Sequence, residues 1–242
     1  MAYIYQPRGP AREYSDWAFN LYKGCSHGCK YCYAPDATHT DRETFLKPQK
    51  RAVDWRVLNR EMQNIPRGKS VFLCFTCDPY QPLEESEQVT RRAIQLLHNA
   101  GLGVIVLTKG GNRSGRDFSL LAERPDLSQY GATLTFISDA DSSKWEPGAA
   151  CPSHRLSMLK KAHDFGIPTW ASLEPVIDPI QSLELIQVAA PFVDLFKVGK
   201  WNHDARANAI DWPAFGREAI ALFESLKKPF YIKADLNKAM HN

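Results

Sequence analysis

Short apolar runs alternate with stretches of helical periodicity along most of the chain. The runs are rich in β-branched and aromatic residues, and they are too continuously apolar to lie half exposed. Seven of them predict β-strands: residues 18–23, 71–77, 103–109, 132–138, 168–176, 195–199 and 229–233. This pattern is typical of a parallel sheet that is buried on both faces.

The segments between these runs predict amphipathic helices, because their apolar side chains recur every three or four residues. The helices are expected from Trp55 to Met62, from a Ser86 cap to Gly101, from Ser153 to Gly166, and from Pro213 to Leu226. The glycine-rich loop 110–115 is expected to be flexible. Alternating strands and helices favour right-handed βα units. We therefore expect an α/β fold, a partial (β/α)6-type barrel with a parallel sheet, in a single domain (1–242, core about 18–235).

Composition excludes several classes of protein. Of 242 residues, 44% are hydrophobic and 24% are charged, which argues against a disordered, collagen-like or coiled-coil chain. No apolar run approaches the roughly 20 residues that a membrane helix needs. The first residues lack the basic-then-apolar pattern of a secretory signal. These features predict a cytoplasmic protein with no membrane partner.

The charge distribution is uneven. Residues 1–70 hold 12 Lys and Arg against 7 Asp and Glu, whereas the other 172 residues hold 18 against 20. A mildly basic N-terminal third is compatible with approach to phosphates, and equally with an ordinary solvated surface.

Three of the six cysteines, Cys25, Cys29 and Cys32, follow the first predicted strand with the spacing C-x3-C-x2-C. Loops that follow strands gather at the carboxyl-terminal mouth of an α/β barrel, where chemistry takes place. An iron–sulfur cluster is usually held by four thiolates, so three leave one iron open to another ligand. The alternative is a Cys3His zinc site with His27 or His39 as the fourth ligand.

This loop, with an aromatic residue before its last cysteine, resembles the signature of the radical S-adenosylmethionine (SAM) superfamily. The resemblance implies a 4Fe-4S cluster on Cys25, Cys29 and Cys32, whose open iron binds SAM. It also implies a flavodoxin- or ferredoxin-like electron donor. Reductive cleavage of SAM would then produce a 5′-deoxyadenosyl radical that abstracts hydrogen from a substrate.

A narrower resemblance is to the spore photoproduct lyase-like group, whose members are described as DNA-repair-photolyase-like. It rests on the cysteine loop and on four further motifs: Asp78-Pro79-Tyr80-Gln81-Pro82-x-Glu84, Leu107-Thr108-Lys109, Glu146-Pro147 and Ser172-Leu173-Glu174-Pro175-Val176. The resemblance implies a lyase-like reaction on DNA or a nucleotide.

Polar residues at predicted strand ends are candidates for binding the cofactor. Asp78 occupies the position where the superfamily contacts the SAM ammonium group, or else it stabilises a turn. Lys109 ends an apolar strand and needs an anion there, unless it extends to the surface. Ser138 matches a cofactor-contacting strand end of the group.

Glu174 ends the fifth predicted strand and has two interpretations. It contacts cofactor or substrate, or it forms a buried ion pair with Lys197 or Lys200. Glu146 and Arg155 are expected to form an ion pair, either near the cofactor or on the surface.

The resemblance also bears on radical handling. Tyr31 and Tyr33 match tyrosines that relay a hydrogen atom in the lyases, although packing against the cofactor is the alternative. The lyases quench the product radical with a cysteine, and Phe75 stands at that position here. Because strand side chains alternate, we expect Cys77 to share the face of Phe75 and Cys74 to point away, so Cys77 is the predicted thiol.

Two other functions remain open. One is a radical SAM enzyme that modifies a peptide or a small metabolite, and the other is a zinc-binding nucleic-acid module. Cys151, in the loop after the fourth predicted strand, is expected to be a free thiol.

Overall fold

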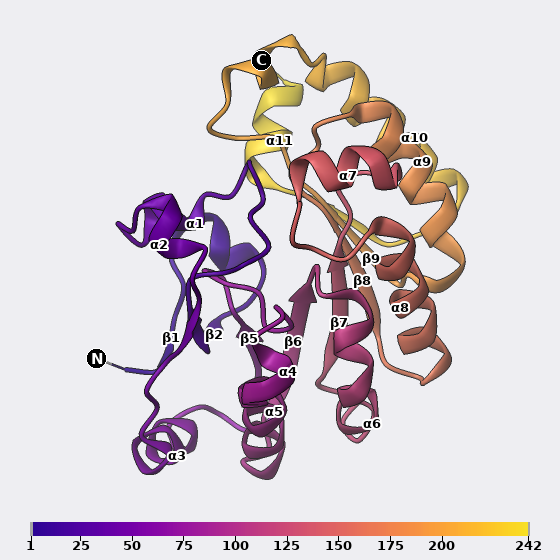
Figure 1. The fold of residues 1–242 in the computed structure, drawn as a ribbon. Helices are drawn as coiled ribbons and strands as arrows, with labels where there is room; N and C mark the ends of the chain where they lie inside the picture. The colour runs from indigo at the N-terminus through magenta and orange to yellow at the C-terminus, as the bar shows by residue number, and fades with distance from the viewer. Residues whose placement is uncertain (1, 242) are drawn as a thin grey trace.

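The computed structural model describes residues 2–241, and its centre is a curved eight-stranded sheet (Figure 1). In spatial order the strands are β1 (Ile4–Tyr5), β2 (Trp17–Phe19), β5 (Ser70–Leu73), β6 (Gly103–Thr108), β7 (Gln129–Thr133), β8 (Thr169–Leu173), β9 (Leu195–Val198) and β10 (Phe230–Ile232). Strand β1 pairs antiparallel with β2, and all later neighbours in this sheet are parallel. A separate two-stranded sheet joins β3 (Tyr22–Lys23) to β4 (Gln49–Lys50).

The predicted α/β fold with a parallel sheet is confirmed. Seven parallel strands follow one another in chain order, one more than a six-stranded barrel requires. Each crossover therefore advances in the same direction, as in a partial barrel. Most of the helices lie around the outer side of the curve (Figure 1).

Several predicted strand limits were wrong. The first predicted strand divides into β2 and β3, which belong to different sheets, and the second ends at Leu73. Cys74 has a backbone φ of 70°, a left-handed conformation that no strand continues through. The fourth strand covers Gln129–Thr133 rather than 132–138, so Ser138 lies beyond it.

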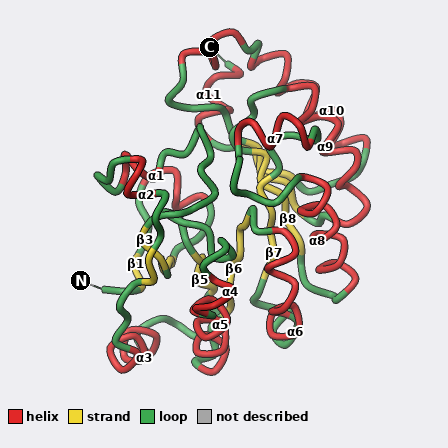
Figure 2. Tube along the Cα trace, viewed as in Figure 1, coloured by secondary structure: helices red, strands yellow, loops and turns green. Residues whose placement is uncertain are grey.

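Figure 2 shows the helices between the strands. The four predicted helices are present as α3 (Trp55–Gln63), α5 (Val89–Asn99), α8 (Pro152–Asp164) and α10 (Trp212–Ser225). The Ser86 cap was wrong, because Ser86 lies inside α4 (Glu84–Glu87) and Gln88 precedes α5. Helices not predicted are α1 (Ala34–Ala37), α2 (Arg42–Phe45), α6 (Phe118–Leu121), α7 (Asp139–Trp145), α9 (Pro179–Ala189) and α11 (Ala234–Met240). No helix among residues 2–241 is both long and apolar enough to cross a membrane.

Four short 3₁₀ helices complete the structure: η1 (Gly9–Glu13), η2 (Gly111–Asp117), η3 (Ala190–Phe192) and η4 (Ala205–Ala209). The loop that was expected to be flexible is largely η2, and Ser114 within it is fully buried.

Alternating side chains divide the sheet between two apolar clusters. On β5, Val71 and Leu73 belong to the large core shared with the helices, whereas Phe72 belongs to a small cluster on the other face. In this small cluster Tyr14 lies with its ring centre 5.7 Å from that of Phe72 and 5.8 Å from that of Trp170. The small cluster therefore fills part of the concave side, beside the candidate site.

Gly131 on β7 makes room for the Trp170 indole in this cluster. A Cβ atom at position 131 would lie 2.3 Å from Trp170 Cε2. We expect Gly131→Ala to lower the free energy of unfolding by about 1–3 kcal/mol, because the buried indole has to move. Urea unfolding checks this, with Gly166→Asn as control, since Gly166 has φ +76° and open space around it. An unchanged midpoint for Gly131→Ala would contradict the packing argument.

Candidate functional site

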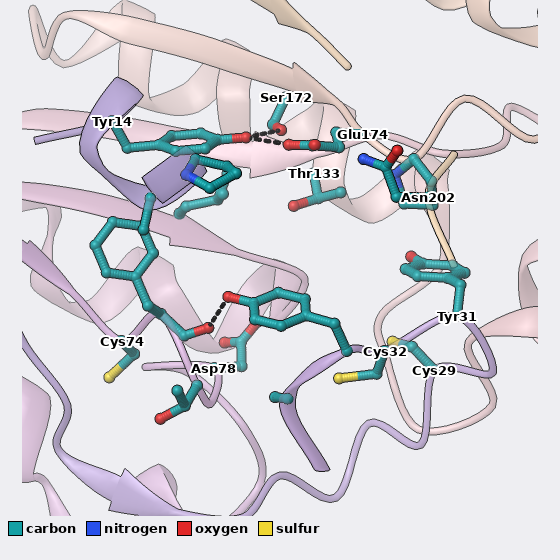
Figure 3. Close-up of a pocket in the computed structure, with 18 of the residues that line it drawn as sticks. Tyr14, Cys29, Tyr31, Cys32, Cys74, Asp78, Thr133, Ser172, Glu174 and Asn202 are labelled. Carbon is teal, nitrogen blue, oxygen red and sulfur yellow. Dashed lines mark hydrogen bonds between the residues drawn. The ribbon is translucent and has the colours of Figure 1, made fainter. Parts of the chain in front are cut away.

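A cavity of about 480 Å³ opens at the carboxyl ends of the parallel strands. Residues after β5, β6, β8, β9 and β10 line it, as do the cysteine loop and η1. The volume is within the range of ligand pockets, and the carboxyl-terminal position is the usual one for α/β folds. Figure 3 shows the lining residues.

The cysteine loop forms one wall of this cavity. Cys25, Cys29 and Cys32 all line the cavity, and all three are free thiols. Figure 3 shows Cys29 and Cys32 on the same side of the cavity as Tyr31. Burial raises the pKa of Cys29 to about 12 and that of Cys25 above its ordinary value.

The donor set fits an iron–sulfur cluster. Cys25, Cys29 and Cys32 lie along one cavity wall as free thiols, and such a cluster is held by cysteine thiolates. Within residues 2–241 no group of three or more His, Cys, Asp or Glu side chains is placed to hold one metal ion. His27 faces Asp78 and Arg113, at 3.4 Å each.

Asp78 lies after β5 and lines the cavity, but its carboxylate is already held within the protein. It accepts hydrogen bonds from Thr108 Oγ1 (2.6 Å), from the Lys109 backbone N–H (2.7 Å) and from the Tyr80 backbone N–H (2.8 Å). These contacts tie the end of β5 to the end of β6 and fix the orientation of the carboxylate.

Lys109 and Tyr31 lie together between the cysteine loop and the strand ends. The Lys109 ammonium is 5.5 Å from the centre of the Tyr31 ring, and both side chains line the cavity. Burial by itself would lower the pKa of Lys109, but Cys29 and Glu146 hold it above its ordinary value. Lys109 is therefore cationic beside the cysteine loop.

Behind them, Glu146 and Arg155 form the predicted ion pair. Arg155 donates to Glu146 Oε2 at 2.6 Å, and each residue is 1% exposed, so the pair is buried and not on the surface. Glu146 also accepts a hydrogen bond from the Tyr31 hydroxyl. The pair thus supports Tyr31 from outside the cavity.

The alternation argument for Cys77 was wrong, because the strand ends at Leu73 before the residues concerned. Cys74, Phe75 and Cys77 all line the cavity. Tyr33 also lines the cavity and donates from its hydroxyl to the Phe75 carbonyl at 2.8 Å.

Glu174 lines the opposite side of the cavity and pairs with a lysine that the sequence argument missed. Lys233 donates to both of its carboxylate oxygens at 2.8 and 2.7 Å, and Tyr14 donates at 2.5 Å. Within residues 2–241 neither Lys197 nor Lys200 forms an ion pair with Glu174. Lys233 directly follows β10. The reasoning that selected Asp78 and Lys109, that polar residues at the carboxyl ends of parallel strands face one cavity, therefore applies to Lys233 as well.

Ser138 and Cys151 are not among the cavity-lining residues. Ser138 precedes α7, and its hydroxyl accepts from the Asp141 N–H at 3.2 Å as a helix cap. Thr133, at the end of β7, lines the cavity instead. Cys151 precedes α8 and contacts Ser153.

The N-terminal segment supplies lining residues that no motif indicated. Arg8, Pro10, Ala11 and Tyr14 all face the cavity. Glu13 anchors the segment to the far edge of the sheet, where its side chain accepts from the Ala234 N–H at 3.1 Å. Only the tertiary structure brings this segment to the site.

Lys197 donates to the Glu13 carbonyl at 3.0 Å, and its pKa is lowered from 10.5 to about 8 by burial and then by Lys233. Between about pH 8 and pH 10.5, Lys197 is therefore protonated in the unfolded chain and deprotonated in the native state. The free energy of unfolding should therefore rise with pH across this window.

We expect wild type to gain stability relative to Lys197→Met between about pH 7 and about pH 9.5. Denaturant titrations at both pH values test this, and a constant difference would contradict it.

The sequence profile of the Radical SAM superfamily matches residues 19–189, and the chain belongs to this superfamily. The family implies SAM and a 4Fe-4S cluster as cofactors.

Three of the proteins with similar sequences carry the description of uncharacterised protein. The one from Acidianus two-tailed virus is 28% identical over 187 residues, which is 71% of this chain and 60% of the relative. The one from Methanocaldococcus jannaschii is 23% identical, over 74% of this chain and 68% of the relative. The one from Mycobacterium tuberculosis is 27% identical, over 66% of this chain and 49% of the relative. The matched region therefore spans less than two thirds of the viral and mycobacterial proteins.

Two kinds of solved structure share the fold. A spore photoproduct lyase variant with bound SAM and dinucleoside spore photoproduct has a TM-score of 0.71 at 13% identity, covering 95% of this chain and 79% of the lyase. SuiB of Streptococcus suis bound to SAM has a TM-score of 0.66 at 13% identity, covering 92% and 51%. At these identities the likeness concerns the fold.

Proposed function

We propose that this chain holds a 4Fe-4S cluster on Cys25, Cys29 and Cys32 and binds SAM in the adjoining cavity. The observation that carries the proposal is that all three thiols line one cavity with the polar residues of the strand ends. When bound, this pair of cofactors supplies a hydrogen-abstracting radical upon one-electron reduction. A flavodoxin- or ferredoxin-like protein is the proposed electron donor.

Four side chains are the proposed contacts for SAM. Asp78, oriented by Thr108 and two backbone N–H groups, takes the ammonium group. Lys109 is a buried cation for the carboxylate or ribose. Thr133 takes the place that the sequence argument gave to Ser138. Glu174 is the fourth proposed contact. The Lys233 ammonium balances its charge in this structure, and the carboxylate would accept from a donor group of bound SAM.

Three residues are proposed to handle hydrogen atoms. Tyr31 and Tyr33 lie on either side of Cys32 and line the cavity, as does Cys77 after β5. Cys77 is the proposed thiol donor because it lines the cavity and is half-buried. Cys74 also lines the cavity, but it is buried and its sulfur already accepts from the Leu21 N–H at 3.5 Å. Tyr33, held by the Phe75 carbonyl, lies between the cysteine loop and this segment.

We propose an anionic substrate, a nucleic acid or nucleotide. Arg8 and Lys200 line the cavity, and within residues 2–241 neither side chain forms an ion pair. Unpaired cations favour phosphate groups. Not all of the basic residues in the first third of the chain line this cavity. The positive charge of that region therefore adds little support for a phosphate-containing substrate. A peptide or small metabolite is the alternative, since a structure of SuiB with a precursor peptide shares the fold at a TM-score of 0.67.

Anaerobic reconstitution tests the proposal in two steps. The full chain should bind iron and sulfide and should cleave SAM to methionine and 5′-deoxyadenosine when reduced. Purification with zinc and without iron would overturn the cofactor assignment. DNA affinity that falls steeply with salt would support the nucleic-acid substrate, and its absence at low salt would favour the peptide or metabolite. Mass spectrometry of irradiated and undamaged DNA after turnover then identifies the product.

A further inference from the structure

The cysteine loop lacks regular secondary structure around its first cysteine. Gly24 has φ +78° and Gly28 has φ +66°, and Cys25 stands between them. A Cβ atom at Gly24 would lie 2.4 Å from the Phe45 carbonyl oxygen. The Cys25 N–H itself donates to the Phe45 carbonyl at 2.8 Å, and the neighbouring peptide groups of Gly24 and Ser26 bind elsewhere.

One buried side chain provides such contacts on both sides of Cys25. The Gln81 amide oxygen accepts from the Ser26 backbone N–H at 3.1 Å, and its amide nitrogen donates to the Gly24 carbonyl at 3.3 Å. Gln81 is 0% exposed, so water does not replace these bonds. The orientation of the amide is unambiguous, because one partner is a donor and the other an acceptor.

Gln81 is itself part of a rigid turn that carries Asp78. The Thr90 hydroxyl donates to the Pro79 carbonyl at 2.6 Å, and Arg113 donates to the Tyr80 carbonyl at 2.9 Å. The Tyr80 N–H in turn binds Asp78. Gln81 therefore joins the loop of Cys25 to the segment that presents Asp78 to the cavity.

We propose that Gln81 is a positioning residue that holds Cys25 in place for the cluster and keeps it in register with Asp78. This inference rests on the proposed cluster. Leucine at position 81 has nearly the same size but leaves the half-buried Ser26 N–H and Gly24 carbonyl without this partner, which costs stability locally in the loop. Glutamate retains an acceptor for Ser26 and loses the donor to Gly24.

The experiment compares the reconstituted full chain with Gln81→Leu, Gln81→Glu and Gln181→Leu. Gln181 is the control, because its side-chain amide also holds two backbone groups and it does not line the cavity. Its amide oxygen accepts from the Ile137 and Ser138 N–H groups at 3.0 and 3.1 Å. The readouts are iron and sulfide per chain, the rate of iron loss to a chelator, the electron paramagnetic resonance spectrum before and after adding SAM, and thermal unfolding.

We expect Gln81→Leu to lose iron about tenfold faster than wild type, since a lost buried hydrogen bond has an effect of this size. Gln81→Glu should be intermediate, and Gln181→Leu should match wild type in iron retention. If Gln81→Leu fails to fold, Gln81→Glu carries the comparison. Iron retention and spectra equal to wild type in both Gln81 variants would overturn the inference alone. A wild-type chain that binds no iron would overturn the proposed function, which is a separate result.

Discussion

We expect Cys29→Ala to abolish the proposed iron–sulfur cluster and with it the reductive cleavage of SAM. Cys29 is buried at 7% exposure, lies between Cys25 and Cys32 in sequence, and lines the same cavity as they do. Replacing even a partner of a metal ligand lowers metal affinity by about 10- to 100-fold, and loss of a direct ligand costs more. We expect SAM cleavage to fall by at least about a hundredfold. Iron analysis and detection of 5′-deoxyadenosine measure both effects.

Cys151→Ala is the matched control for this prediction. Cys151 is also a free thiol, but it precedes α8 and does not line the cavity. It should retain the iron content and cleavage rate of wild type. Equal activity of Cys29→Ala and Cys151→Ala would exclude the proposed cluster ligands.

Breaking the buried ion pair should produce the largest loss of stability. Glu146→Gln leaves Arg155 uncompensated at 1% exposure, although Arg155 still donates to the Ala150 carbonyl at 2.7 Å and the Thr133 carbonyl at 3.1 Å. Burial by itself would raise the pKa of Glu146, but Arg155 and Lys109 hold it below its ordinary value, so the native residue is anionic. We expect the free energy of unfolding to fall by about 3–5 kcal/mol.

Chemical denaturation of four variants checks this estimate: Glu146→Gln, Arg155→Met, the double variant and a control. The double variant Glu146→Gln/Arg155→Met should be more stable than the sum of the two single changes predicts, because no buried charge is left alone. Lys160→Met removes the exposed Lys160–Asp164 pair and should change stability little. Additive losses in the double variant would show that the two charges do not act as a pair.

Much of the candidate site could be predicted from local sequence. The spacing of Cys25, Cys29 and Cys32 places three thiols on one loop, although this loop follows β3 of the two-stranded sheet and not a strand of the parallel sheet. Asp78 and Lys109 follow from the rule that polar residues at the carboxyl ends of parallel strands face one mouth. Ser138 was predicted at a strand end because the apolar run extends past Thr133, where β7 ends, and in the structure Ser138 caps α7 instead.

The sequence by itself determined the α/β class, the parallel sheet and the cysteine loop, because each depends on neighbouring residues. Only the tertiary structure decided which partners meet across the cavity. Lys233 reaches Glu174 across 59 residues, Tyr14 reaches it across 160, and Gln81 reaches the Cys25 loop across 55. Such pairs depend on how the sheet curves and where the N-terminal segment crosses it, because these decide which distant residues meet. Neither can be predicted from a local sequence pattern.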